Sequence, residues 1–279
     1  MRRCVQIQLI SLIFLSVVFP QGSQSGLRPI VVQGAMRSET EELAGRLTNV
    51  SIDHVGGWTF WRGFVDGYPV IVSRTLRGIA NAAAATAIAI EQYHPLAIIN
   101  QGTAGGHDPG LHLYDIVLGK NAVSLGAFKT PYRAPGAGSN PLYWTPLNMM
   151  SPEGTSSGDS AGHRVARFSA DSVLLAVSRR VAGLYKHGRV VEGVIGSSDM
   201  WVDELDLIEK YHSAYGSSVE DMETSSAAQI ASHFHIAFIG IRIVSDNTTN
   251  GDAYDPKTGS ACQDFVHKVV KAYAGALAR

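Results

Sequence analysis

Short apolar runs recur along the chain, and longer stretches with helical patterning separate them. Runs of this kind, rich in β-branched residues, predict strands. The runs at 29–33, 96–100 and 236–245 are almost entirely apolar, which is typical of central strands covered on both faces. We expect strands over 29–33, 69–73, 96–100, 115–119, 190–196 and 236–245.

The stretches between these runs have helical composition. The clearest is Ala-rich and ends just before Pro95, a residue that cannot continue a helix. We expect helices over 39–47, 79–93, 171–184, 203–213, 223–234 and 261–277. The alternation of strands and helices predicts an α/β fold: a three-layer αβα single domain over 26–279, around a central mixed, largely parallel sheet.

One segment, about 129–165, lacks periodicity and is interrupted by several prolines. Loops of this length inside a compact domain are usually functional or disordered. The segment is too apolar for a simple linker, since it carries Tyr132, Tyr143, Trp144, Met149 and Met150. We interpret it as a loop insertion that forms a lid or a subunit contact, or that wraps over the surface.

The N-terminus reads as a targeting segment. Arg2 and Arg3 precede an apolar run, and Ser23 and Ser25 supply the small residues that a signal peptidase needs. The run from 9 to 19 is short for a membrane span. Residues 1–25 are therefore predicted to be a cleaved export signal, with an uncleaved anchor as the alternative, and the mature protein to be exported (periplasmic or secreted), away from the membrane.

Composition narrows the classes of partner. The chain is 45% apolar and 17% charged, and its net charge is −1 without a block of Lys or Arg, which argues against disorder and against nucleic acid as a partner. Cys4 lies in the predicted signal, so the mature chain keeps only Cys262 and cannot form an internal disulfide. The histidines form no zinc pattern, so we expect no metal site.

Three acidic sites occupy one kind of position, directly after an apolar run: Glu39, Asp221 with Glu223, and Asp246. Ligands of open α/β sheets bind at the carboxyl ends of strands, but acids also suit helix N-termini, so each site has a structural alternative. Ser38 and Glu41 fit a capping box. Arg242 lies inside the most apolar run and needs an acidic partner, because a buried unpaired charge is costly.

Two further strand ends carry candidate ligand contacts. The sequence NQGTAGG follows the run at 96–100, and its glycines would allow a ligand to approach the backbone, although it fits neither a Walker nor a dinucleotide pattern. Trp201 follows the run at 190–196 and could stack on a flat ring. Taken alone, Trp201 fits an ordinary core position better.

Taken together and in order, these segments resemble the nucleoside phosphorylase/hydrolase superfamily, most of all its 5′-methylthioadenosine/S-adenosylhomocysteine nucleosidases. The similarity is carried by GAMRSETEEL, by RGIANAAAATAIAIEQYHPLAIINQGTAGGHDPGLHLYDIVLG, and by GSSDMW, EDMETSSAA and IRIVSDNT. It covers most of the mature chain except 129–165. The resemblance implies an enzyme that hydrolyses the N-glycosidic bond of adenine nucleosides, without a cofactor and as a homodimer.

The resemblance also implies roles for individual residues. Glu39 would activate the attacking water, Asp246 would protonate N7 of the adenine, and Arg242 would lie near the water and ribose. Burial must keep Asp246 protonated while Glu39 stays ionised, the opposed states expected of an acid and base pair. The implied substrate contacts are Met36, Thr103, Ala104, Gly105, Trp201 stacked on the base, Val202 at the adenine edge through its backbone, Asp221, Met222 beneath the sugar, Glu223 on the ribose hydroxyls, and Ser245.

Water is favoured over phosphate as the nucleophile. The family's phosphorylases carry an Arg just before the glycine loop, where this chain has Asn100. Arg37 and Arg77 could still bind an anion, so a purine nucleoside phosphorylase remains an alternative. A non-catalytic nucleoside-binding or storage protein is the other, because a fold does not fix a function.

Overall fold

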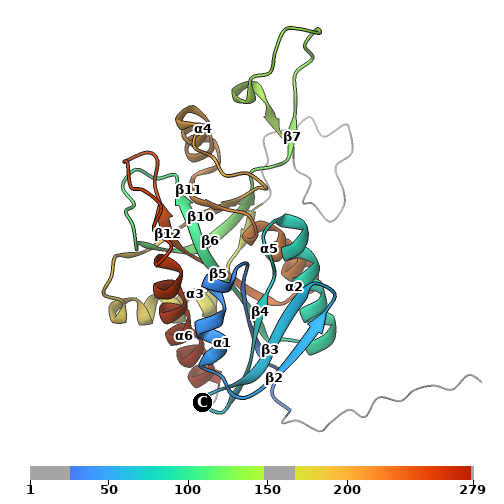
Figure 1. Ribbon diagram of the computed structural model, residues 1–279, viewed down its shortest axis with the longest axis vertical. Coiled ribbons are helices and arrows are strands. Elements are labelled where there is room, and N and C mark those ends of the chain that lie inside the picture. The colour runs from blue at the N-terminus through green and yellow to red at the C-terminus, as the bar shows by residue number, and fades with distance from the viewer. Residues whose placement is uncertain (1–25, 148–166, 278–279) are drawn as a thin grey trace, which may run out of the picture.

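A ten-stranded mixed sheet forms the middle layer of the molecule, and the strand order is β11-β10-β6-β12-β5-β1-β4-β3-β2 with β9 beside β6 (Figure 1). This computed structural model describes residues 26–147 and 167–277; the predicted signal and part of the 129–165 segment lie outside them. The sheet strands are β1 (Ile30–Gly34), β2 (Thr48–Val55), β3 (Trp58–Val65), β4 (Tyr68–Arg74), β5 (Ala97–Gly106), β6 (Ile116–Ser124), β9 (Arg167–Ser169), β10 (Val190–Ser197), β11 (Ser217–Asp221) and β12 (Ala237–Asp246).

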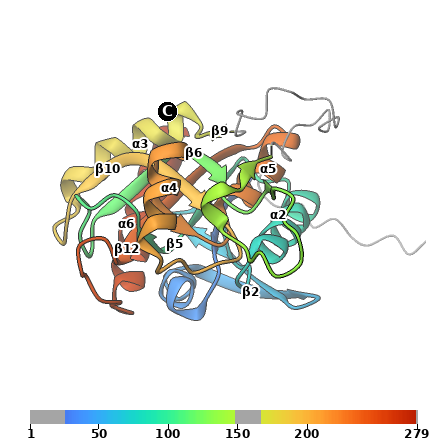
Figure 2. The same cartoon turned by 90° about the horizontal axis from the view of Figure 1, so that it is seen from above.

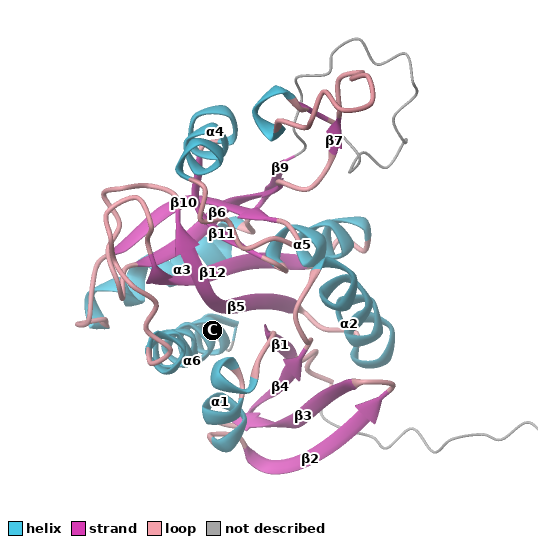
Figure 3. Cartoon of the chain, turned by 45° about the horizontal axis from the view of Figure 1, so that its top comes forward, coloured by secondary structure: helices cyan, strands magenta, loops and turns pink. Residues whose placement is uncertain are grey.

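The predicted three-layer αβα arrangement is confirmed. Helices α2 and α5 cover one face of the sheet, and α1, α3 and α6 cover the other (Figures 2 and 3). No helix in the described part of the chain is both long and apolar enough to cross a membrane. The helices are α1 (Glu41–Gly45), α2 (Ile79–Tyr93), α3 (Ser172–Val181), α4 (Leu205–Tyr215), α5 (Thr224–His233) and α6 (Thr258–Leu277), with 3-10 turns at Arg37–Glu39, Pro141–Tyr143 and Ala182–Leu184.

Strand β1 shows why the central runs are continuously apolar. Successive side chains of a strand point to opposite faces. Ile30 and Val32 therefore join the core under α1, α3 and α6, whereas Val31 joins the core under α2 and α5. All three side chains are fully buried.

The sheet is mixed, as predicted, and its antiparallel share is larger than the sequence indicated. Strands β2 and β3 form a hairpin that extends one edge antiparallel to β4. The sequence reading omitted this hairpin because β2 is mostly exposed and has no apolar run. A glycine pair at Gly56 and Gly57, a typical hairpin turn, marks it in the sequence.

Five strands close into a ring. Strand β5 pairs with β12, and β12 with β6, β6 with β10, and β10 with β11; β11 then pairs back onto the end of β5, where Glu220 lies opposite Gly105. On the other side of β5, Asp246 of β12 also lies opposite Gly105, after a register shift at Ser245. Ring closure therefore gathers acidic residues of β11 and β12 on either side of one glycine.

The described part of the Pro-rich segment forms an arm beside α4 (Figure 1). It contains a short ribbon of β7 (Phe128–Lys129) and β8 (Thr145–Pro146). Lys210 of α4 anchors the arm, because its Nζ donates to the carbonyls of Pro141, Leu142 and Trp144 at 2.7, 3.1 and 2.9 Å. Met149 and Met150 lie outside the described residues.

Candidate active site

A cavity opens at the carboxyl ends of β1, β5, β11 and β12. Most of the residues singled out from the sequence line it, including the predicted contacts Met36, Thr103, Ala104, Gly105 and Ser245. Arg242 and Val202 are the predicted residues that do not. The full lining is Ala35, Met36, Glu39, Arg77, Thr103, Ala104, Gly105, Met200, Trp201, Glu220, Asp221, Met222, Glu223, Ser245, Asp246 and Tyr254.

Glu39 lies at one end of the cavity with both carboxylate oxygens hydrogen-bonded. Its Oε2 accepts from the backbone N–H groups of Ala35 and Met36 at 2.9 and 3.1 Å, and its Oε1 accepts from the backbone and hydroxyl of Thr103 at 2.9 and 3.0 Å. All four contacts are donors, the arrangement that an ionised, acceptor-only carboxylate requires.

Glycine at position 102 makes this approach possible. A Cβ at Gly102 would lie 2.6 Å from Glu39 Oε1, well inside van der Waals contact. Gly102, inside β5, therefore allows Glu39 to pack against the strand. The Ser38–Glu41 capping box is not formed, because α1 begins at Glu41 itself and that side chain pairs with Arg37 and Arg74 on the surface.

Asp246 lies at the other end, where β12 shifts register. The Ser245 hydroxyl donates to Asp246 Oδ1 at 2.8 Å, and Oδ2 approaches the space above Gly105. Burial, assisted by the negative charges of Glu220 and Asp203, raises the pKa of the Asp246 carboxyl above its ordinary value, against the opposing effect of the Ser245 hydrogen bond. This is the direction that a proton donor near neutral pH requires.

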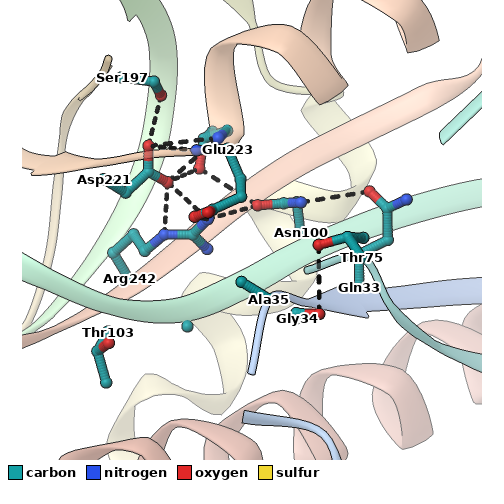
Figure 4. A network of polar contacts seen from close by, with 12 residues as sticks. Gln33, Gly34, Ala35, Thr75, Asn100, Thr103, Ser197, Asp221, Glu223 and Arg242 are labelled. Atoms are coloured by element: carbon teal, nitrogen blue, oxygen red, sulfur yellow. Dashed lines mark hydrogen bonds and ion pairs between the residues drawn. The ribbon is translucent and has the colours of Figure 1, made fainter. Parts of the chain in front are cut away.

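Arg242 pairs with an acid, as its place in an apolar strand predicts. The residue is 1% exposed. Its Nε donates to Asp221 Oδ2 at 2.6 Å, and its Nη2 donates to Asn100 Oδ1 at 2.5 Å (Figure 4). Asp221 also accepts from the Thr224 backbone at the start of α5. Arg242 and Asp221 thus form a buried network behind the cavity, and only Asp221 reaches the lining.

Glu223 follows this network and faces the cavity. Its Oε1 accepts from the backbone N–H of Gly78 at 2.9 Å, and its Oε2 lies 3.9 Å from Arg242 Nη2. Burial, and then the charge of Asp221, raise the pKa of Glu223 to about 8, although Arg242 acts in the opposite direction. Met222, the preceding residue, also lines the cavity.

Trp201 is not a core residue, contrary to the simplest interpretation of its position. It lies in the loop after β10, is 61% exposed, and meets Tyr254 edge-on with ring centroids 5.7 Å apart. An exposed aromatic ring at the rim of a cavity can stack on a flat ligand. Tyr254 was not found from the sequence, because it lies in an irregular loop between β12 and α6 without a local pattern.

Val202 differs from the sequence expectation that its backbone meets the adenine edge. Its N–H donates to Glu220 Oε1 at 2.8 Å, and its side chain packs into the core between α4 and the sheet. The carboxylate of Glu220 thus stands between this peptide and the cavity. Glu220 also lines the cavity, and the sequence analysis assigns it no role.

Comparison with known proteins places this site in a family. The family model described as the phosphorylase superfamily matches residues 29–279, so the chain belongs to the phosphorylase superfamily. A 5′-methylthioadenosine/S-adenosylhomocysteine nucleosidase of Bacillus cytotoxicus is 27% identical over 256 residues, which cover 87% of this chain and 98% of that one. One from Bacillus cereus is 28% identical over 226 residues, 78% and 85% of the two chains.

Solved structures agree with the sequence comparison. The 5′-methylthioadenosine/S-adenosylhomocysteine nucleosidase of Neisseria meningitidis, in complex with methylthio-immucillin-A, is 25% identical and superposes with a TM-score of 0.70 over 88% of this chain and 99% of that one. The futalosine hydrolase of Helicobacter pylori, 21% identical, shares the fold with a TM-score of 0.70 over 88% and 98%. The similarity extends over nearly the whole described domain.

In the described ranges, no group of three or more His, Cys, Asp or Glu side chains is arranged to hold a metal ion. The single cysteine of the described chain, Cys262, is buried and free.

Proposed function

We propose that the protein hydrolyses the N-glycosidic bond of adenine nucleosides such as 5′-methylthioadenosine and S-adenosylhomocysteine, releasing adenine. One observation carries the proposal: two carboxylates in opposite surroundings approach the same strand. Glu39 accepts hydrogen bonds from four donors of Ala35, Met36 and Thr103 and lies against Gly102. Asp246 is partly buried at Gly105, and its pKa is raised. Three residues along a strand span roughly 10 Å, comparable to the length of a nucleoside.

The chemistry follows from these surroundings. Breaking the bond leaves a positively charged, oxocarbenium-like sugar and a purine anion. Protonated Asp246 donates to N7 of the purine and neutralises the leaving group, while ionised Glu39 orients a water molecule and takes its proton. Each such step typically contributes ~10²–10⁴ in rate.

The ribose lies between these two ends in the proposal. Glu223 offers its carboxyl group to the ribose hydroxyls, and Met222 gives an apolar surface beneath the sugar. Trp201 stacks on the base at the open rim. Arg242 touches no substrate in this arrangement; it positions Asp221 and the adjacent Glu223.

Hydrogen bonds within the protein favour water over phosphate as the nucleophile. The N-terminus of a helix is a common phosphate site, and that of α2 faces this region. Its first N–H groups, at Gly78 and Ile79, already donate to Glu223 and Asp199 at 2.9 and 2.8 Å. Asn100 is 1% exposed and accepts from Arg242. Arg77 is the cation of the lining that could attract an anion, and the assay therefore includes phosphate.

The test follows base and sugar products by chromatography. Purified protein is incubated with 5′-methylthioadenosine, S-adenosylhomocysteine, adenosine or inosine, each with and without phosphate. We expect adenine and free sugar without phosphate. Release of a sugar 1-phosphate only when phosphate is present would identify a phosphorylase instead. Binding without turnover of any nucleoside would favour a binding or storage protein.

The remaining sequence expectations are proposals about the mature form. We infer that residues 1–25 are removed during export and that the exported domain is a homodimer. N-terminal sequencing of protein collected outside the cytoplasm is expected to begin near Gly26. Light scattering of that protein is expected to give twice the mass of the chain.

A further inference from the structure

Glu220 and Asp246 converge on one point of the cavity. They lie on strands β11 and β12, on either side of β5, and both are opposite Gly105 in the strand register. A Cβ built at Gly105 would lie 3.4 Å from Asp246 Oδ2, 3.5 Å from Glu220 Cγ and 3.8 Å from Glu220 Oε1. The glycine thus leaves a space that two carboxyl groups share.

Glu220 is buried and has acceptor capacity to spare. The residue is 6% exposed, and Oε1 accepts one hydrogen bond, from the Val202 backbone. Within the described chain, Oε2 has no hydrogen-bond partner. A carboxylate can accept about four hydrogen bonds, and a buried polar atom without a partner is costly. Oε1, the carboxylate oxygen nearer to Gly105, can accept a second hydrogen bond, so a ligand that donates one in this space would add to the hydrogen bonds of Glu220.

His107 is a buried residue that lies beside the carboxyl group of Glu220. Its Nε2 lies 3.4 Å from Glu220 Oε2, and its Nδ1 lies 2.7 Å from the Ser217 hydroxyl. The ring is 2% exposed and stacks on Tyr211 at 5.9 Å. His107 is not part of the cavity lining, so Oε2 of Glu220 faces a buried ring, and Oε1 is the oxygen nearer to Gly105.

Purine chemistry identifies the donor. N7 and the substituent on C6 are neighbours on one edge of the base, so a carboxylate beside the N7 acid faces the C6 substituent. A 6-amino group donates hydrogen bonds, whereas a 6-oxo group only accepts them. A carboxylate accepts without donating. It therefore binds the first and repels the second.

We propose that Glu220 selects 6-amino purines over 6-oxo purines by accepting a hydrogen bond from the exocyclic amino group of the base whose N7 faces Asp246. This inference rests on the proposed function for the orientation of the base. Glu220 replaces the Val202 peptide as the group that meets this edge.

The test compares the two base types in the wild type and in Glu220→Gln, which keeps the shape and the acceptor for Val202 but removes the negative charge that repels a 6-oxo group. Calorimetry measures the binding of adenine and hypoxanthine, and kinetics measure kcat/KM for 5′-methylthioadenosine and 5′-methylthioinosine. We expect the wild type to favour the 6-amino form by ~100-fold or more, and the variant to reduce that ratio at least ~10-fold. Much of the change should come from tighter binding of hypoxanthine and a higher kcat/KM for 5′-methylthioinosine.

Asp203→Asn is the matched control. Asp203 is exposed, outside the cavity lining, and its charge also acts on Asp246, so this variant removes a nearby negative charge without touching the base. We expect its 6-amino to 6-oxo ratio to equal that of the wild type. An equal loss of ratio in both variants would assign the effect to charge alone and overturn the proposal.

The outcomes separate this inference from the proposed function. If the wild type cleaves no nucleoside but the binding ratio of adenine to hypoxanthine still falls in Glu220→Gln, the hydrolase proposal fails and the role of Glu220 stands. If cleavage is normal and the ratio is unchanged in the variant, the hydrolase proposal stands and the role of Glu220 is wrong. A wild type that binds adenine and hypoxanthine equally well would also show that the role of Glu220 is wrong. This measurement uses the wild type alone and does not depend on the folding of a variant.

Discussion

At the scale of single residues, the same functional group serves opposite purposes according to its partners. Glu39 is buried but accepts hydrogen bonds from four donors, whereas Asp246 is partly buried near other acids. Hydrogen bonds to a carboxylate favour its charged form, whereas burial and like charges favour its neutral form. The division of labour between base and acid is thus visible in the surroundings of each group.

Replacing Asp246 with Asn is expected to lower kcat by ~10²–10⁴ while nucleoside binding persists, because the side chain keeps its size but has no proton to give. In the wild type, kcat should fall as pH rises past the raised pKa of Asp246, since only the protonated form donates. That alkaline limb should be missing from the residual activity of the variant. Full activity in Asp246→Asn would exclude Asp246 as the proton donor.

Glu223 predicts how stability depends on pH. Its carboxyl has an ordinary pKa of 4.5 that rises to about 8 in the folded protein, so the folded state holds this proton more tightly than the unfolded state does. The associated stabilisation is complete below about pH 4.5 and is lost as pH rises toward 8. Ionisation of Glu223 therefore lowers the stability of the folded protein as the pH rises.

Glu223→Gln, which cannot ionise, should remove this term. Between pH 5 and 8, the free energy of unfolding of the wild type is expected to fall by roughly 2 kcal/mol or more relative to the variant. Urea titrations at several pH values measure the difference. Parallel curves for the two proteins would show that Glu223 is already ionised in the folded state at pH 5.

At the scale of elements, strand β5 supports both ends of the site through glycine. Gly102→Ala would place a methyl group 2.6 Å from Glu39 Oε1, so either the carboxylate or the strand must shift. We expect kcat to fall at least ~10-fold through the misplaced base. The free energy of unfolding should fall by about 1–3 kcal/mol through overpacking.

Gly275→Ala provides the matched comparison, because a Cβ at Gly275 meets no atom within 4 Å and the residue lies inside helix α6. There the same change should stabilise the protein by about 0.5–1 kcal/mol and leave kcat unchanged. Equal kinetics in both variants would contradict the role assigned to Gly102. Circular dichroism and steady-state kinetics suffice for both proteins.

The elements themselves were largely accessible from the sequence. The helix predicted over 79–93 has those bounds. The strand predicted at 29–33 is shifted by one residue from β1, and the strand predicted at 190–196 ends one residue before β10 does. Apolar periodicity and proline stops are local signals. The apolar pattern does not predict the β2–β3 hairpin, because β2 is exposed, or β11, because polar residues interrupt it.

The site was predictable in part, and through resemblance more than through pattern. The acids after apolar runs, such as Glu39 and Asp246, do meet at one cavity, because strand ends gather there. The pairing of Arg242 follows from the cost of an isolated buried charge. The hydrogen bond from the Val202 backbone to Glu220 depends on the pairing of β11 with β5. These strands are distant in the chain, and no local pattern predicts that they pair.

At the scale of the whole molecule, one lysine connects the arm of residues 128–147 to the domain. Lys210 donates to three carbonyls of the arm, and its Nζ lies 5.5 Å from the centre of the Phe128 ring. Burial lowers the pKa of Lys210. Lys210→Met keeps the aliphatic stem but removes all of these donors.

We expect Lys210→Met to increase hydrogen exchange and protease cleavage in the arm, with little change elsewhere, because the variant keeps the stacking of Phe128 on Tyr211 but loses the hydrogen bonds that tie the arm to α4. Lys186→Met is the control, since Lys186 donates only to Gly183 in its own loop. Faster exchange throughout the sheet in Lys210→Met would show instead that the arm stabilises the whole domain.

The ring of five strands also has a consequence for how activity arises during folding. Strand β5 ends at residue 106, and the strand that completes the ring begins at residue 217, so more than a third of the chain lies between the two halves of the base site. Contacts so distant in sequence form slowly, because the intervening chain must first be ordered. Catalysis should therefore be the last property to return on refolding, after secondary structure and most burial. A nascent chain released before β11 and β12 would contain Glu39 and its glycine cradle and still lack both the proton donor and the residue that reads the base.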